Sequence, residues 1–291
     1  MKFIKSNAYG NDFLLVARQD AAGHRPDVLA RTMCDRHAGV GADGLILFEP
    51  TADGATMQLY NADGGRAEVS GNGLRCLAAL VVEQRQIGLP APGGPAAGGP
   101  PLAPVVITTD AGPKALTPLS RSHERVTFRA AMGAARDIRQ ADIDVAGRRV
   151  KAVLLSMGNP QCVIPGPLPS EADFQAIGAA LERHPMFPDG TNVEFSEAVG
   201  PTALRIRIWE RGVGPTMSSG TGTCAAAVAA ASFTTGDRDF DVTSPGGTQR
   251  VEVRGDNVYL TGWAELVFSG DWPDARERPP HPEAGPVDAI S

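Results

Sequence analysis

The sequence contains two Ser-Gly-x-Gly turns, and each is followed directly by an apolar run of helical character. Glycines at a helix start let a ligand approach the exposed backbone N–H groups, and these groups together with the helix dipole bind a carboxylate or phosphate. Either turn alone is more often only a helix start capped by a serine. One in each half of the chain predicts duplicated domains whose helix N-termini face each other across one anion site. The turns read Ser70-Gly71-Asn72-Gly73-Leu74-Arg75-Cys76 and Ser219-Gly220-Thr221-Gly222-Thr223-Cys224.

Four further polar segments interrupt apolar strands and are placed to line the same cleft. An arginine binds a carboxylate through its fork of donors, a glutamate binds an ammonium, and an asparagine offers both a donor and an acceptor. This combination suits a zwitterion, although turns, a strand-edge asparagine and a surface ion pair explain the same residues. The segments are Tyr60-Asn61-Ala62-Asp63-Gly64-Gly65, Met157-Gly158-Asn159-Pro160-Gln161, Gly190-Thr191-Asn192-Val193-Glu194-Phe195 and Trp209-Glu210-Arg211-Gly212-Val213-Gly214.

The elements that must position these residues are short β-type runs separated by a few helices, which predicts an α+β fold. Helices are expected over residues 73–84, 172–183 and 223–234. Strands are expected near residues 3–4, 13–16, 44–48, 56–60, 105–109, 126–128, 150–155, 162–164, 192–195, 204–209, 240–243, 249–253 and 258–260. The Pro-, Gly- and Ala-rich residues 90–104 are expected to form a flexible insertion, and residues 271–291 a disordered tail.

Length and charge limit the classes of protein. The 291 residues, 42% of them apolar, are enough for two cores. A net charge of -6 without a basic run argues against binding nucleic acid. We expect no membrane association, because neither a signal peptide nor an apolar run of about 20 residues is visible. Reduced thiols in the cytoplasm, and no metal site, are expected because the cysteines lack paired spacing: Cys34, Cys76, Cys162 and Cys224.

Seven motifs in order make the chain resemble the diaminopimelate epimerase family over nearly its whole length. The resemblance implies two pseudo-symmetric domains, residues 1–129 and 130–257, each a curved sheet wrapped around a central helix. Residues 258–270 return to the first domain. A cofactor-independent homodimer with its active site between the domains is implied as well. The motifs are Asn7-Ala8-Tyr9-Gly10-Asn11-Asp12-Phe13, Gly41-Ala42-Asp43-Gly44, Asn61-Ala62-Asp63-Gly64, the first Ser-Gly turn, Met157-Gly158-Asn159-Pro160, Thr191-Asn192-Val193-Glu194-Phe195, and Glu210 to Gly222.

The resemblance also implies a substrate, LL- or meso-diaminopimelate, and residues that bind it. Arg211 with Asn61 and Asn192 would bind the carboxylate of the unreacting end, and Glu210 would hold its ammonium. Backbone N–H groups of the two turns would bind the reacting carboxylate, where the helix dipoles stabilise a carbanion. The substrate-binding set is Asn11, Asn61, Gly71, Asn72, Asn159, Asn192, Glu210, Arg211, Gly220 and Thr221.

Ser70 and Ser219 stand where the family has its two catalytic cysteines, and Gln161 stands where it has a histidine. A thiol has a pKa of about 8.5 and is more acidic at a helix start, whereas a serine hydroxyl is a far weaker acid. The two serines remain the catalytic candidates. Cys76 and Cys224 lie further along their helices, so we expect buried, inert thiols.

Three functions stay open. The first, favoured because the residues for the distal end persist, is an epimerase in which polarised serines or a bound water transfer the protons. The second is a related racemase or dehydratase acting on another amino acid. The third is a binding form without turnover, either a natural pseudoenzyme or an engineered double Cys→Ser variant. Neither a metal nor pyridoxal phosphate is expected, because the motifs contain no ligand cluster and no lysine.

Overall fold

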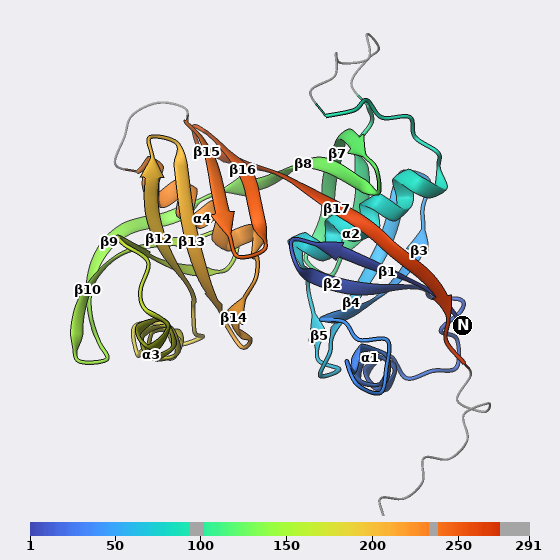
Figure 1. Cartoon of the computed structure of the whole chain (residues 1–291), viewed down its shortest axis with the longest axis horizontal. Coiled ribbons are helices and arrows are strands. Elements are labelled where there is room, and N and C mark those ends of the chain that lie inside the picture. The colour runs from blue at the N-terminus through green and yellow to red at the C-terminus, as the bar shows by residue number, and fades with distance from the viewer. Residues whose placement is uncertain (93–101, 233–237, 274–291) are drawn as a thin grey trace, which may run out of the picture.

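The computed structural model describes residues 1–92, 102–232 and 238–273, which form two lobes connected by two long strand segments (Figure 1). Most of the expected insertion at 90–104 and of the expected tail at 271–291 therefore lies outside the described residues. The start of that tail is ordered, because Asp271 ends a strand and Trp272 donates its backbone N–H to the carbonyl oxygen of Met1 at 2.7 Å.

The two lobes repeat one order of elements: two strands, a helix, three strands, a helix and three strands. The first lobe contains β1 (Lys2–Ala8), β2 (Asn11–Ala17), α1 (Pro26–Cys34), β3 (Gly44–Pro50), β4 (Gly54–Asn61), β5 (Arg66–Ala67), α2 (Gly71–Gln84), β6 (Val105–Thr109), β7 (Gly112–Ser122) and β8 (Arg125–Ala134). After β9 (Arg136–Val145), the second contains β10 (Arg148–Ser156), β11 (Pro160–Pro165), α3 (Glu171–Glu182), β12 (Asn192–Gly200), β13 (Ala203–Glu210), β14 (Gly214–Thr216), α4 (Gly220–Ala231), β15 (Arg238–Ser244), β16 (Gly247–Arg254) and β17 (Asn257–Asp271).

Strand pairing closes each lobe into a ring. In the first lobe the order is β1, β2, β3, β4, β6, β7, β8, β17 and back to β1. In the second lobe β10, β11, β12, β13, β15 and β16 follow in the same way, and β17, β8 and β9 complete the ring. Parallel pairs occur at equivalent places, β2 with β3 and β11 with β12.

Two strand segments are exchanged between the lobes. The first half of β17 pairs with β16, whereas its second half pairs with β1. In the same way β8 pairs with β7, and its continuation β9 pairs with β10. The two segments also pair with each other, Leu260 opposite Ala130, and so cross between the lobes (Figure 1). This crossing fixes how the lobes are placed.

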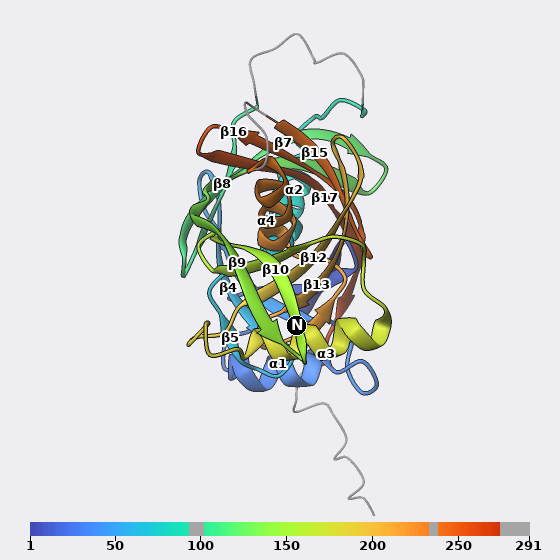
Figure 2. The same ribbon diagram turned by 90° about the vertical axis from the view of Figure 1, so that its left-hand side faces the viewer.

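A helix fills the middle of each ring. The core around α2 and the core around α4 are separate clusters of buried apolar side chains, and Figure 2 shows both helices surrounded by strands. Helices α1 and α3 lie outside the rings and cover further clusters. The expected α+β fold of two similar domains is confirmed. Separate cores support a boundary near residue 129, which stays a proposal.

Several elements were not predicted. Helix α1 was missed because it has nine residues, of which only Leu29, Ala30, Met33 and Cys34 are buried. Strands β5, β7, β9 and β14 were also missed, since they are very short or carry many exposed polar residues. Helices α2 and α4 begin at Gly71 and Gly220, earlier than expected, because their glycines are part of the first turn. No helix among residues 1–92, 102–232 and 238–273 is long and apolar enough to cross a membrane.

Candidate active site

The two serines occupy the same place at the starts of the two central helices. Ser70 is the N-cap of α2, and its Oγ accepts a hydrogen bond of 3.2 Å from the backbone N–H of Gly73. Ser219 is the N-cap of α4, and its Oγ accepts from the N–H of Gly222, also at 3.2 Å. Each oxygen acts as an acceptor for its own helix, and Ser219 Oγ also lies 3.4 Å from Thr221 Oγ1, where either hydroxyl can be the donor.

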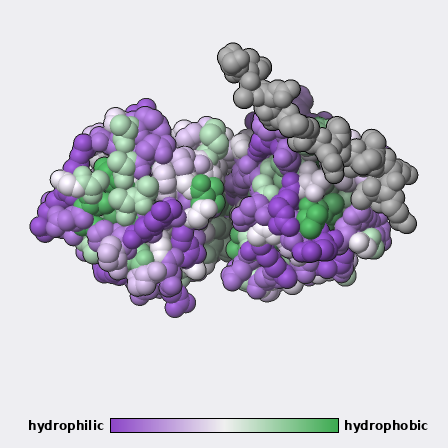
Figure 3. Space-filling model, turned by 90° about the horizontal axis from the view of Figure 1, so that it is seen from below, coloured by the Kyte–Doolittle hydropathy of each residue, from purple (hydrophilic) through white to green (hydrophobic). Residues whose placement is uncertain are grey.

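The helix starts touch each other. A Cβ built on Gly71 would lie 3.8 Å from the Cα of Gly220, and a Cβ on Gly220 would lie 3.8 Å from the Cα of Gly71. The positive ends of two helix dipoles thus meet, which is unfavourable unless an anion lies between them. Seen from below, the surface is hollowed between the two lobes (Figure 3).

The four cysteines do not reach this site. All are free and buried, and Cys76 and Cys224 belong to the cores around α2 and α4. Burial raises the pKa of the Cys76 thiol to about 12, and it does the same to Cys224. The expected burial of these two thiols is confirmed, and their inertness stays a prediction.

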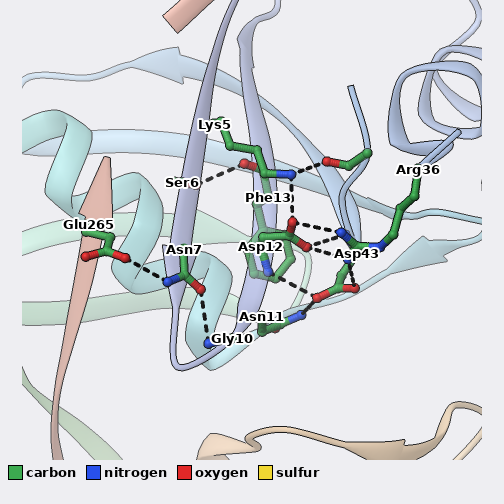
Figure 4. A network of polar contacts seen from close by, with 11 residues as sticks. Lys5, Ser6, Asn7, Gly10, Asn11, Asp12, Phe13, Arg36, Asp43 and Glu265 are labelled. Atoms are coloured by element: carbon green, nitrogen blue, oxygen red, sulfur yellow. Dashed lines mark hydrogen bonds and ion pairs between the residues drawn. The ribbon is translucent and has the colours of Figure 1, made fainter. Parts of the chain in front are cut away.

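Asn11 contacts a cluster of acidic and basic side chains, formed by Lys5, Asp12, Arg36 and Asp43 (Figure 4). Asn11 Nδ2 donates to Asp43 Oδ2 at 2.6 Å, and Arg36 Nη2 donates to Asp43 Oδ1 at 2.7 Å. Arg36 and Lys5 also pair with Asp12, at 2.8 and 2.6 Å. Burial alone would raise the pKa of Asp12, but hydrogen bonds from Arg36 and Lys5 lower it below its ordinary value. Asn11 is therefore oriented by Asp43, which Arg36 holds in place.

Asn72 connects the first helix start to the second. Its Nδ2 donates to Asn11 Oδ1 at 3.2 Å and to the carbonyl oxygen of Ser218, the residue before Ser219, at 3.4 Å. Its Oδ1 accepts from Arg75 Nη2. The side chain is buried, so its orientation is fixed by these contacts.

The predicted binding residues of the second lobe form a second group. Asn192 Oδ1 accepts from the backbone N–H of Arg211 at 3.0 Å, and its Nδ2 donates to the carbonyl oxygen of Pro160 at the same distance. The Arg211 guanidinium donates to the carbonyl oxygen of Asp189 at 2.9 Å. Asn159 Oδ1 accepts from Gln161 Nε2 at 2.6 Å. The backbone of Arg211 is thus fixed, whereas its side chain is exposed.

Glu210 ends β13 and is half-buried. Burial raises the pKa of its carboxyl, a hydrogen bond from Thr216 opposes this, and the charge of Asp43 raises it further. The charge of Asp43, in the first lobe, thus acts on a carboxyl of the second lobe.

Asn61 is exposed at the end of β4, and Thr221 is half-buried in the first turn of α4.

Glu194 is the most unusual residue near the second helix start. It is fully buried, both of its carboxyl oxygens lack a hydrogen-bond partner, and its Oε1 lies 2.6 Å from where a Cβ on Gly222 would be. Burial raises the pKa of this carboxyl well above its ordinary value, and the charge of Glu210 adds to the effect. Glu194 is therefore a buried carboxyl with a raised pKa, beneath the turn that Ser219 caps.

Sequence reasoning did not single out four polar residues that the structure places at or behind the helix starts. Two had a signal within a motif, Asp43 in Gly-Ala-Asp-Gly and Arg75 inside the first Ser-Gly turn, and Glu194 lay beside the predicted Asn192. Gln249 had no signal at all, because it reaches the site from β16. Within the described ranges, no group of three or more His, Cys, Asp or Glu side chains could hold a metal ion.

Comparison with known sequences decides the family. The profile described as diaminopimelate epimerase matches residues 3–95 and 153–267. The chain belongs to the diaminopimelate epimerase family. The diaminopimelate epimerase of Synechococcus sp. (strain JA-3-3Ab) is 38% identical over 93% of this chain and 97% of its own length. That of Desulfitobacterium hafniense (strain DSM 10664 / DCB-2) shows the same identity and the same coverage.

Solved structures show the same fold at low sequence identity. A phenazine biosynthesis protein of the PhzF family from Bacillus anthracis is 14% identical, with a TM-score of 0.66 over 93% of this chain and 98% of that one. A probable proline racemase from Agrobacterium radiobacter is 17% identical, with a TM-score of 0.67 over 94% and 92%. The chain thus shares its fold with proteins named for phenazine biosynthesis and proline racemization.

Proposed function

We propose that this protein is an isomerase that interconverts LL- and meso-diaminopimelate by proton transfer at the α-carbon. The observation that carries the proposal is the meeting of the Ser70 and Ser219 helix starts, which lie so close that a Cβ on Gly71 would contact Gly220. The diaminopimelate epimerases of Synechococcus and Desulfitobacterium support the choice of substrate. A carboxylate between the starts would meet backbone N–H groups from both helices.

In the proposed reaction the α-proton leaves on one face of the carbon and a new proton arrives on the other. The electron pair of the broken C–H bond moves into the carboxylate, which then carries a second negative charge. The N–H groups of Gly71 with Asn72, and of Gly220 with Thr221, would stabilise that charge as it develops. Ser70 and Ser219 would serve the two faces, directly or through a bound water.

The remaining predicted residues would hold the distal end of the substrate. The hydrogen bond between Asn192 and the Arg211 backbone supports a carboxylate site there, with Asn61 at the end of β4. Glu210 would hold the distal ammonium, since a cation nearby would oppose the rise in its pKa caused by burial and return it to the ionised form. Asn11 and Asn159 complete the proposed set; Asn11 is oriented by hydrogen bonds with Asp43 and Asn72, and Asn159 by one with Gln161.

The assembly, location and cofactor requirement of the protein are proposed as well. We propose a cytoplasmic homodimer that needs no metal and no organic cofactor, as the family resemblance implies. Sedimentation tests the dimer, and exchange activity that survives a chelator tests the absence of a metal. Loss of activity with chelator and its return with one added metal would contradict the proposal.

The deciding experiment is α-proton exchange of LL- and meso-diaminopimelate in heavy water, followed by NMR. It compares the unaltered protein with the Ser70→Cys/Ser219→Cys double variant and with a Ser70→Ala/Ser219→Ala control. We expect exchange with inversion by the unaltered protein, faster in the cysteine variant because a thiolate is the better base. Exchange by the cysteine variant alone would mean that this chain binds without turnover. Silence of both would remove the substrate assignment.

A further inference from the structure

Arg75 is a buried cation without an acidic partner. It lies one turn into α2, only 2% exposed, and no ion pair within the described part of the chain includes it. Its Nη2 donates to Asn72 Oδ1 and, at 3.0 Å, to Gln249 Oε1, and its Nε has no hydrogen-bond partner. The ring of Tyr9 lies beside it, with its centroid 5.5 Å from Arg75 Cζ.

Such an arrangement is unfavourable in the ligand-free protein. A buried charge is normally retained only where an opposite charge and hydrogen bonds compensate its lost hydration. Several other arginines pair with carboxylates, as with Arg36 and Asp12, Arg66 and Asp110, and Arg129 and Glu252. The missing counter-charge of Arg75 therefore points to an anion that arrives from outside.

The contacts of Arg75 lead to both helix starts. Through Asn72 the guanidinium is connected to the carbonyl oxygen of Ser218, next to Ser219. Through Gln249 it is connected to Ser218 Oγ at 3.1 Å and to Thr223 Oγ1, in the first turn of α4, at 3.2 Å. Its charge thus adds to the positive ends of two helix dipoles at the point where they meet.

We infer that Arg75 supplies a fixed counter-charge for the carboxylate bound between the two helix starts. The inference rests on the proposed function and deepens it by adding a positioning residue that acts through Asn72 and Gln249. When the α-proton leaves, the carboxylate gains a second negative charge, and a preorganised cation in a dry site then attracts it more strongly. Arg75 should therefore affect the proton transfer more than the binding of the substrate.

Gln249→Glu is the sharpest test, because it places a carboxylate on Arg75 with almost no change in shape. We expect the ligand-free variant to melt at a higher temperature than the unaltered protein, since the buried charge is now paired. We also expect diaminopimelate to bind about tenfold more weakly and α-proton exchange to fall about a hundredfold. A merely structural Arg75 predicts the higher melting temperature with unchanged binding and exchange, which would overturn the inference.

Matched controls separate charge from shape. Gln140→Glu adds the same charge on the exposed strand β9, far from α2 in sequence, and should leave binding and exchange unchanged. Arg75→Lys keeps the charge, and Arg75→Gln removes it; only the second should lose exchange strongly. These two variants decide the question if Gln249→Glu does not fold. Equal losses in both would mean that shape matters rather than charge, against the inference.

A titration with acetate separates this inference from the proposed function. Binding and exchange by the unaltered protein test the substrate, whereas acetate needs only the anion site. Acetate should raise the melting temperature of the unaltered protein and of Gln140→Glu more than that of Gln249→Glu. If diaminopimelate neither binds nor exchanges, the proposed function fails, and the acetate series still decides for or against Arg75. An equal rise in all three proteins would overturn the inference.

Discussion

Ile46 and Glu194 occupy equivalent places in the two lobes, one beneath each central helix. A Cβ built on Gly73 would lie 3.1 Å from Ile46 Cδ1, and a Cβ on Gly222 would lie 2.6 Å from Glu194 Oε1. Ile46 lies opposite Leu59 of the next strand, and Glu194 lies opposite Ile208. The backbone is thus the same on both sides, whereas an apolar side chain supports one helix start and a carboxyl supports the other.

A second difference lies in the helices themselves. Counted from the capping serines, Arg75 of α2 corresponds to Cys224 of α4. One start therefore has a cation in its first turns, and the other has a buried carboxyl with a raised pKa beneath it. Duplication explains the shared cradle of N–H groups, and divergence of a few buried side chains gives the two faces of the site different electrostatics. Two serines that look alike in the sequence are expected to differ in acidity.

The largest effect is expected when a carboxyl is placed beneath α2, in the first lobe, instead of beneath α4. Ile46→Glu buries a carboxyl in the core around α2 and should lower the free energy of unfolding by about 3–5 kcal/mol. Urea unfolding followed by circular dichroism measures this change. Ile46→Gln, which is polar without a charge, is the control. A loss below about 1 kcal/mol would show that the place beneath α2 accepts an acid as readily as that beneath α4.

The next effect concerns Glu194 and pH. Its folded-state pKa is raised by burial, so above the ordinary pKa the unfolded chain releases a proton that the folded chain retains. The stability that Glu194 contributes is fully present at low pH and is lost as the pH rises through the folded-state pKa. At pH 8 the free energy of unfolding of Glu194→Gln should therefore exceed that of the unaltered protein by about 1–3 kcal/mol. At pH 4 the gain should be small. Equal gains at both pH values would contradict a neutral Glu194.

Substituting the two matched glycines tests how tightly each helix start is packed. Gly222→Ala places a methyl group against the Glu194 carboxyl and should cost about 1–2 kcal/mol. In Gly73→Ala the nearest atom to the new methyl group is the end of the flexible Ile46 side chain, at 3.1 Å, and the helix gains propensity, so we expect a change within about 1 kcal/mol. Thermal unfolding of both variants measures the difference. A larger loss at Gly73 would reverse the comparison.

The smallest expected effect is a difference in thiol acidity. In the single variants Ser70→Cys and Ser219→Cys, the rate of alkylation as a function of pH gives the pKa of each new thiol. Position 70 caps the helix that carries Arg75, whereas the Glu194 carboxyl lies beneath the helix that position 219 caps, so the first pKa should be lower by about one unit. The buried Cys76 and Cys224 should stay unlabelled in both variants. Equal values would show that the helix starts alone set the acidity.

Much of the fold was predictable because local patterns agreed with it. The strands at residues 13–16, 44–48 and 204–209 and the helix of residues 172–183 are present nearly as expected, since their apolar residues recur with the period of the element. The duplicated Ser-Gly turns predicted two similar domains. Strands β7 and β9 were missed because their stability comes from pairing with β8 and β10, which no local pattern shows.

The candidate site was only partly visible in the sequence. Motif residues such as Asn11, Asn72 and Asn192 are present near the helix starts or beside Arg211, but their roles in binding stay predictions. Gln249 was not foreseeable, because it follows Arg75 by more than half the chain and meets it only across the crossing of the lobes. The raised pKa of Glu194 depends equally on neighbours from other strands.

By itself the sequence determined the family, the α+β class, the repeated helix starts and the types of side chain available for chemistry. Only the tertiary structure decided which of these meet: that the helix starts at Gly71 and Gly220 lie together, that Gln249 reaches Arg75, and that no carboxylate of the described residues pairs with Arg75. The physical reason is that helix starts and turns are encoded by neighbouring residues. Burial and the electrostatic surroundings of a charge depend on strands exchanged between the lobes, far apart along the chain.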